Sequence, residues 1–140
     1  MKVLVVVDDI VARRAVEAAL QRGGFRTIGV ADGLAAWEIL KRADSPRLVV
    51  LDWAMDGLDG PEILARMSAM PGRAPSHVVM TSVRGTHEDV VAALEAGADD
   101  FVLKPFHAGE LRARVQAGAR KLERLVALEE RIAELQRPAA

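Results

Sequence analysis

Residues 3–9 read Val3-Leu4-Val5-Val6-Val7-Asp8-Asp9, an unbroken aliphatic run that ends in two carboxylates. An apolar run without alternation is typical of a strand that is buried on both faces. Similar runs recur at 47–51, 77–81 and 100–103, and a weaker one lies at 27–30. The sequence therefore predicts five short strands.

Segments with helical spacing separate these strands. Gly23-Gly24, Asp32-Gly33, Gly60-Pro61 and Thr86 are typical of helix ends. The apolar positions expected on the helix faces are Val11, Ala15, Ala18 and Ala19; Leu34, Trp37 and Leu40; Ile63, Leu64 and Met67; and Val90, Val91 and Leu94. Strictly alternating strands and helices predict an α/β fold, a doubly wound parallel sheet of five strands with helices on both faces.

Composition narrows the class of protein. The chain has 140 residues, 51% hydrophobic and 28% charged, with a net charge of −1 and no cysteine. These values suit one folded domain and exclude disulfide frameworks and thiolate metal sites. A neutral balance disfavours direct binding to nucleic acid or to an anionic membrane, and no apolar stretch approaches the roughly 20 residues that span a bilayer. We expect a cytoplasmic protein.

Polar side chains stand where four of the predicted strands end. They are Asp8 and Asp9, Asp52, Thr81 and Ser82, and Lys104. The carboxyl ends of parallel strands share one edge of a sheet, and ligands bind there. Because three carboxylates repel one another unless a cation joins them, and because oxygen ligands suit Mg²⁺ better than zinc, we expect Mg²⁺ at this edge.

Five motifs together resemble a known family. They are Val7-Asp8-Asp9, Asp52 with Met55 and Asp59-Gly60, Thr81-Ser82, the run from Ala96 to Phe101, and Lys104-Pro105-Phe106. In this order and spacing they resemble the CheY-like receiver domain of two-component response regulators over about residues 1–120. The resemblance implies a flavodoxin-like sheet with the strand order 2-1-3-4-5.

The resemblance also implies the chemistry of the site. Asp52 would accept a phosphoryl group from a phosphohistidine on a sensor histidine kinase or a histidine phosphotransfer protein. Asp9, Asp52 and the carbonyl of Ala54 would hold Mg²⁺ directly, with Asp8 acting through a water. Such a protein is a phosphoacceptor rather than an enzyme, with at most intrinsic self-phosphorylation and autodephosphorylation.

A switch follows from the same resemblance. Lys104, preceding a cis peptide to Pro105, would bind the phosphoryl group, as would the backbone at Trp53, Ala54 and Ser82. Thr81 would turn its hydroxyl onto that group, and Phe101 would move inward. This change would alter the surface formed by the helix near 90–94, the strand at 100–103 and the last helix.

Some residues depart from the family pattern or allow other interpretations. Asp56 stands where the family often has proline, and Ala54 and Val83 cannot orient a water, which predicts slow autodephosphorylation. Asp8 and Asp9 alone are equally compatible with capping the next helix. A phosphorylation-independent binding scaffold is one alternative. A phosphatase of the haloacid dehalogenase type is another, although that family's second aspartate has no counterpart at Ile10 or Ala54.

The chain continues past this domain as a helix-forming segment at 121–140. Leu125, Leu128, Ile132 and Leu135 are spaced by 3, 4 and 3, as in a coiled coil. A helix from His107 to Gln136 would be about 45 Å long, more than a small domain can cover. We expect a parallel homodimer in which Arg124 pairs with Glu129; a solvated single helix, or the start of a linker to an output domain, remains the alternative.

Overall fold

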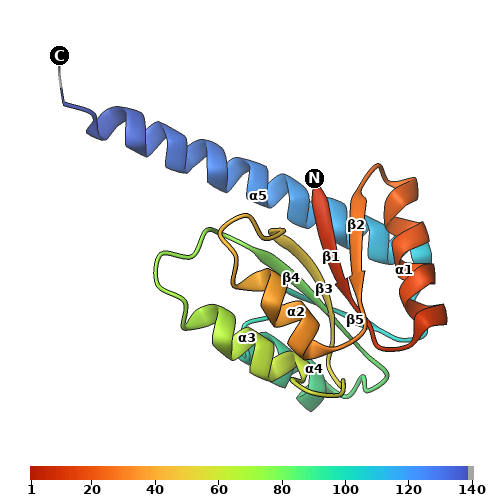
Figure 1. Cartoon of the computed structure of the whole chain (residues 1–140). Coiled ribbons are helices and arrows are strands. Elements are labelled where there is room, and N and C mark those ends of the chain that lie inside the picture. The colour runs from red at the N-terminus through yellow and green to blue at the C-terminus, as the bar shows by residue number, and fades with distance from the viewer. Residues whose placement is uncertain (139–140) are drawn as a thin grey trace.

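Five strands and five helices alternate along residues 1–138, the part of the chain that the computed structural model describes (Figure 1). Their bounds are β1 (Lys2–Val6), α1 (Ile10–Arg22), β2 (Arg26–Val30), α2 (Gly33–Leu40), β3 (Leu48–Asp52), α3 (Gly60–Ser68), β4 (His77–Ser82), α4 (His87–Glu95), β5 (Asp100–Leu103) and α5 (Ala108–Gln136). All five predicted strands are present, shifted by at most one residue at either end.

The strands form one parallel sheet in the order β2-β1-β3-β4-β5, which confirms the predicted topology. Successive residues of β1 point to opposite faces, so Val3 and Val5 pack with α1 and α5, whereas Leu4 and Val6 pack with residues of α2, α3 and α4. Because helices cover both faces, β3 and β4 are buried along their whole length.

The predicted helix faces were partly wrong. On α1, Val11 is 74% exposed and Ala15 and Ala18 are exposed as well. The predicted Ala19 is buried, together with Val16 and Leu20 on the same stripe. Leu34, Val91 and Leu94 are also exposed, and α2 and α4 contact the sheet through small residues such as Ala36 and Ala93. Small side chains at these positions let the short helices lie close to the sheet, and Leu34, Val91 and Leu94 lie outside the contact, whereas the predicted Leu40 of α2 is fully buried.

Helix α5 changes its environment along its length. Its first half packs on the sheet through Leu111, Val115 and Leu122, and the remainder projects from the domain (Figure 1). The helix has no break at the boundary expected near residue 120. His107 is its N-cap, with Nδ1 accepting from the N–H groups of Gly109 and Glu110. None of the described helices is long and apolar enough to cross a membrane.

Candidate functional site

Asp52 lies at the centre of the carboxyl edge of the sheet. It is the last residue of β3 and pairs in register with Thr81 of β4. The exposed fractions of Asp52 and Thr81 are 2% and 1%. Lys104 directly follows β5, and its backbone N–H donates to the Ser82 carbonyl at 2.7 Å. Parallel pairing of three neighbouring strands therefore brings a carboxylate, a hydroxyl and an ammonium together.

One carboxylate oxygen of Asp52 contacts both the Thr81 hydroxyl and the Lys104 ammonium. The Thr81 hydroxyl donates to Oδ1, and Lys104 Nζ lies 2.7 Å from the same atom. Burial raises the pKa of Asp52, the contacts with Lys104 and Thr81 oppose that rise, and the charge of Asp8 adds to it. The carboxylate is thus held in a desolvated position by a single cation.

The second oxygen of Asp52 is left open. No residue among 1–138 hydrogen-bonds Oδ2, although only 3% of the Asp52 side-chain surface is exposed. A cavity of about 310 Å³ adjoins this edge. Its lining is Trp53, Ala54, Met55, Asp59, Ser82, Val83 and Arg84. Oδ2 is therefore the oxygen that is available for chemistry.

Asp8 and Asp9 serve local structure at the start of α1. Asp9 Oδ2 accepts from the Ala12 N–H at 2.7 Å as the N-cap, and Asp8 Oδ1 accepts from the Asp9 N–H at 2.8 Å. Helix capping, one of the two interpretations of this pair, is therefore present. Within residues 1–138 no three acidic or histidine side chains lie close enough to form a metal site.

The carboxylates of Asp8, Asp9 and Asp52 nevertheless fit a Mg²⁺ ion that keeps several of its waters. Asp8 is near enough for its charge to raise the pKa of Asp52, and Asp9 Oδ1 takes part in no hydrogen bond with a described residue. Mg²⁺ in proteins usually keeps several waters and uses only one or two carboxylates. A compact set of three carboxylates is therefore not required.

The residues predicted to bind the phosphoryl group or to act in the switch lie in different environments. The Lys104–Pro105 peptide is cis. The backbone of Trp53 was expected to bind the phosphoryl group. Its N–H instead donates to the Thr81 carbonyl at 2.9 Å and extends the hydrogen bonding between β3 and β4 past the end of β3. Ala54 is exposed beside the cavity, and Phe101 is half-buried against the core on β5. The Thr81 hydroxyl already points at Asp52 without a phosphoryl group.

Gly60 brings the start of α3 against the site, a feature that the sequence interpretation did not explain. Its N–H donates to the Trp53 carbonyl at 2.9 Å. A Cβ at this position would lie 2.7 Å from the Asp52 carbonyl oxygen. Asp59 and Glu62 form a capping box around this turn. The Asp59-Gly60 pair thus fixes the loop that forms one wall of the cavity.

A doubly wound parallel sheet with the strand order β2-β1-β3-β4-β5 defines a flavodoxin-like α/β domain. Comparison with known proteins identifies which one. The family model described as the response regulator receiver domain matches residues 3–116. The chain belongs to this family.

Individual relatives agree with this assignment. The transcriptional regulatory protein CseB of Streptomyces coelicolor is 43% identical over 122 residues, which are 85% of this chain and 49% of that protein. PrrA of Mycobacterium tuberculosis is 40% identical over 122 residues, 86% of this chain and 50% of that protein. The chain thus spans about half the length of these curated relatives.

Solved structures show the same fold. The receiver domain of the Francisella response regulator 1452 has a TM-score of 0.79 at 28% identity, covering 86% of this chain and 97% of that one. The BeF3-activated DrrB receiver domain has a TM-score of 0.75 at 29% identity, covering 85% and 97%.

Proposed function

We propose that this receiver domain accepts a phosphoryl group on Asp52 from a phosphohistidine of a sensor histidine kinase or a histidine phosphotransfer protein. The observation that carries the proposal is the asymmetry of the buried carboxylate. Thr81 and Lys104 hold Oδ1, while Oδ2 has no hydrogen-bond partner among residues 1–138. A carboxylate fixed in this way presents one oxygen as a nucleophile.

The transfer uses groups that are already in place. Oδ2 of Asp52 forms the new O–P bond, the P–N bond of phosphohistidine breaks, and its electron pair leaves with the imidazole nitrogen. Lys104 can move from Oδ1 to a phosphoryl oxygen, because an ammonium acts as a point charge with rotatable donors. Thr81 can donate to the same group, and the resulting acyl phosphate carries a charge of about −2 where the carboxylate carried −1, which gives both residues a stronger partner.

Mg²⁺ would be held by Asp52, by Asp9 with Asp8 in support, and by the carbonyl of Ala54. When bound, it supplies charge neutralisation for the oxygens of the transferring group. Asp9 can provide Oδ1 without giving up its N-cap, since the cap uses Oδ2.

An apolar groove of about 700 Å³ beside the site suits a helix of the phosphodonor. Its lining is Ala12, Ala15, Ala18, Ala19, Arg22, Val83, Lys104, Pro105, Phe106 and Ala108. Lys104 belongs to both the groove and the acceptor site, so a helix bound there would hold its phosphohistidine near Asp52. Ala15→Glu is expected to slow transfer from a phosphorylated histidine kinase but not labelling by acetyl phosphate; equal slowing with both donors excludes this role.

The main proposal is tested by labelling the intact chain with acetyl phosphate and Mg²⁺ and measuring the mass increase. Labelling should be lost in Asp52→Asn and in EDTA, and it should persist in Asp56→Asn, which removes an exposed carboxylate from the adjacent loop. No labelling of the unmodified chain, or labelling that persists in Asp52→Asn, contradicts the proposal. The first of these results favours the alternative of a binding scaffold.

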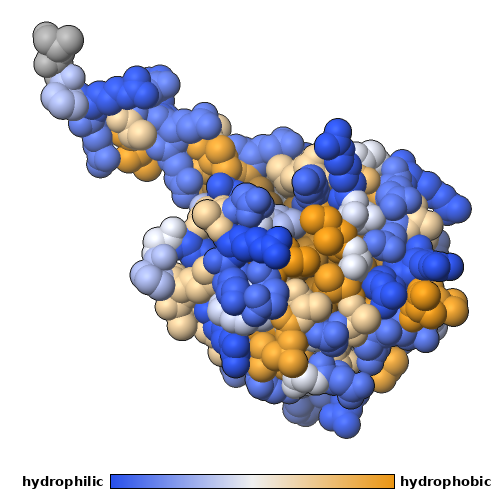
Figure 2. Space-filling view, in the orientation of Figure 1, coloured by the Kyte–Doolittle hydropathy of each residue, from blue (hydrophilic) through white to orange (hydrophobic). Residues whose placement is uncertain are grey.

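We further propose that the projecting part of α5 forms a parallel homodimer. Leu128, Ile132 and Leu135 are 58%, 53% and 73% exposed, and Figure 2 shows apolar patches along this helix. Their a/d spacing continues from half-buried Leu125. Light scattering should give twice the monomer mass, and Ile132→Asp should give a monomer, whereas Glu130→Gln should not. A monomeric unmodified chain at high concentration contradicts this proposal.

A further inference from the structure

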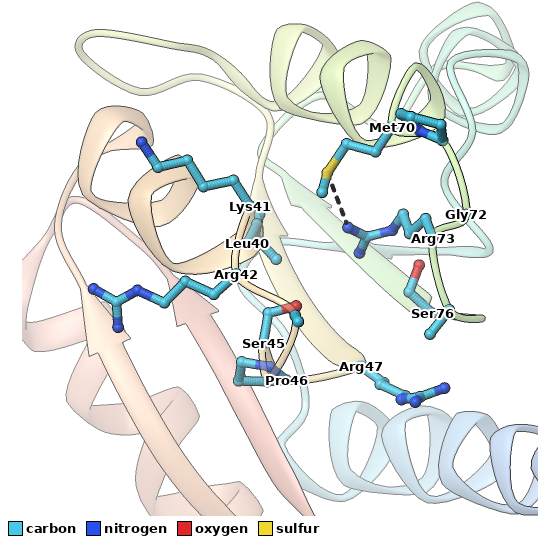
Figure 3. A pocket seen from close by; sticks show the side chains of 13 residues that line it. Leu40, Lys41, Arg42, Ser45, Pro46, Arg47, Met70, Gly72, Arg73 and Ser76 are labelled. Carbon is cyan, nitrogen blue, oxygen red and sulfur yellow. Dashed lines mark hydrogen bonds between the residues drawn. The ribbon is translucent and has the colours of Figure 1, made fainter.

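A third pocket lies at the edge of the sheet opposite Asp52. It is formed by the connection from α2 to β3 and the connection from α3 to β4, and its volume is about 290 Å³ (Figure 3). Its lining is Leu40, Lys41, Arg42, Ala43, Ser45, Pro46, Arg47, Met70, Pro71, Gly72, Arg73, Ala74 and Ser76. Four of these side chains are cationic, two carry hydroxyls, and none is a carboxylate.

The charges of this pocket are poorly compensated. Lys41 pairs with Glu38 at 2.9 Å, but within residues 1–138 no carboxylate lies within ion-pairing distance of Arg42, Arg47 or Arg73. Lack of a partner alone is ordinary for a surface arginine, because water solvates it. Arg47 and Arg73 differ from such residues in being partly buried.

Burial leaves these two guanidinium groups without adequate partners. Arg47 Nη1 is buried and has no hydrogen-bond partner. Arg73 Nη1 donates only to the sulfur of Met70, at 3.7 Å, and a thioether is a weak acceptor (Figure 3). Burial, followed by the nearby charge of Arg47, lowers the pKa of Arg73. Arginine does not lose its proton in proteins, so an anion bound in the pocket would compensate these charges.

The shape and donors of the pocket indicate which anion. Figure 3 shows the Arg73 guanidinium in the space between the two connections, with the hydroxyls of Ser45 and Ser76 facing the same space. The Arg47 side chain lies at the margin of this space and extends toward α5. Guanidinium forks with hydroxyls match the several oxygens of a phosphoryl group better than the two of a carboxylate. The volume is near the lower limit for small-ligand sites, which suits a phosphate or a small phosphate ester.

We propose that Arg47, Arg73, Ser45 and Ser76 form a binding site for a phosphate or phosphate-monoester group at the amino edge of the sheet. The site is separate from the acceptor aspartate and would tie together the two connections that enter β3 and β4. Occupancy would stabilise both strands without touching Asp52.

The experiment is an amide chemical-shift titration of the full chain in Mg²⁺-free buffer at constant ionic strength. The probes are inorganic phosphate, ADP and adenosine. Phosphate and ADP should shift amides in residues 41–47 and 69–76, and adenosine should not. Tighter binding of ADP than of phosphate identifies a nucleotide as the ligand, whereas equal binding identifies phosphate itself. Shifts confined to the Asp52 edge, spread over the surface, or equal for adenosine overturn the proposal.

Variants sharpen the result. Arg47→Gln and Arg73→Gln should each weaken phosphate binding at least 10-fold, while Arg14→Ala, which removes an exposed arginine on α1, should leave it unchanged. Equal weakening in all three variants would mean that only net charge matters and would overturn the site. Both glutamine variants remove a poorly compensated buried charge, so they should fold, and the shift map of the unmodified chain needs no variant.

Discussion

The two edges of the sheet differ in whether their buried polar atoms have hydrogen-bond partners. At the carboxyl edge, Asp52 is deeply buried but has Thr81 and Lys104 on one oxygen. At the amino edge, Arg47 Nη1 and both ring nitrogens of His77 are buried without partners, and they are the unpartnered buried side-chain atoms found in residues 1–138. Protein contacts compensate the carboxylate at the first edge, whereas no described residue hydrogen-bonds these nitrogen atoms at the second.

The largest expected change in the free energy of unfolding comes from a substitution at the carboxyl edge. Lys104→Met removes the one cation beside Asp52, so unfolding free energy in Mg²⁺-free buffer should fall by about 2–3 kcal/mol, because a buried charge is left unpaired. Urea denaturation at pH 7 measures this change. The double variant Lys104→Met with Asp52→Asn should recover most of the loss. A double variant as unstable as Lys104→Met alone would mean that the lysine acts through packing.

A smaller, pH-dependent effect is expected at the amino edge. Burial lowers the pKa of His77, Asp99 and Asp100 oppose this shift, and Lys121 adds to it. The ring packs against Gly118 of α5, where a Cβ would overlap it. Because the folded state binds the proton less well than the unfolded state, the stability is fully present above the ordinary pKa of about 6.5 and decreases as the pH falls below it.

Urea denaturation between pH 8 and pH 5 tests this effect. The unfolding free energy should fall by at most about 1.4 kcal/mol per pH unit below pH 6.5. His77→Phe should flatten this part of the profile, whereas His87→Gln, a change of an exposed histidine on α4, should not. An equally steep profile in His77→Phe would assign the acid sensitivity to other groups.

The smallest expected effect concerns Asp52 itself. Because burial raises its pKa, the folded state binds the proton more tightly, and stability is lost as the pH rises from the ordinary value of 3.8 through the folded pKa. Asp52→Asn should therefore stabilise the Mg²⁺-free protein by about 1 kcal/mol at pH 7. The gain should vanish near pH 4. Thermal melts at both values measure it, and a loss of stability at pH 7 would show that Lys104 compensates the carboxylate fully.

Much of the carboxyl edge could be predicted from the sequence. Each of its residues follows a buried apolar run, and parallel strands align their ends, so Asp52, Thr81 and Lys104 had to meet. Their one-sided contact on Oδ1 could not be predicted, because it depends on side-chain orientation. Neither could the hydrogen bond of Trp53, whose N–H continues the ladder past the end of β3.

The pocket at the amino edge had no comparable signal. Arg47 and Arg73 lie in different connections, and a single arginine in a loop is normally solvated. No pattern in the sequence marks His77 as buried, and its ring packs against the glycine opposite it on α5. The exposed positions of Val11 and Val91 were missed because helical spacing marks an apolar stripe without showing how much of it the sheet covers.

The sequence by itself determined the five strands, their alternation with helices, the acidic edge and the helical extension, because these follow from local runs, caps and periodicity. Only the tertiary structure decided which oxygen of Asp52 has no hydrogen-bond partner and which faces of the helices are buried. It also decided that Arg47 and Arg73, which lie far apart in the chain, line one pocket. Those features depend on side chains that meet through packing of elements far apart in the chain, and no local pattern records such contacts.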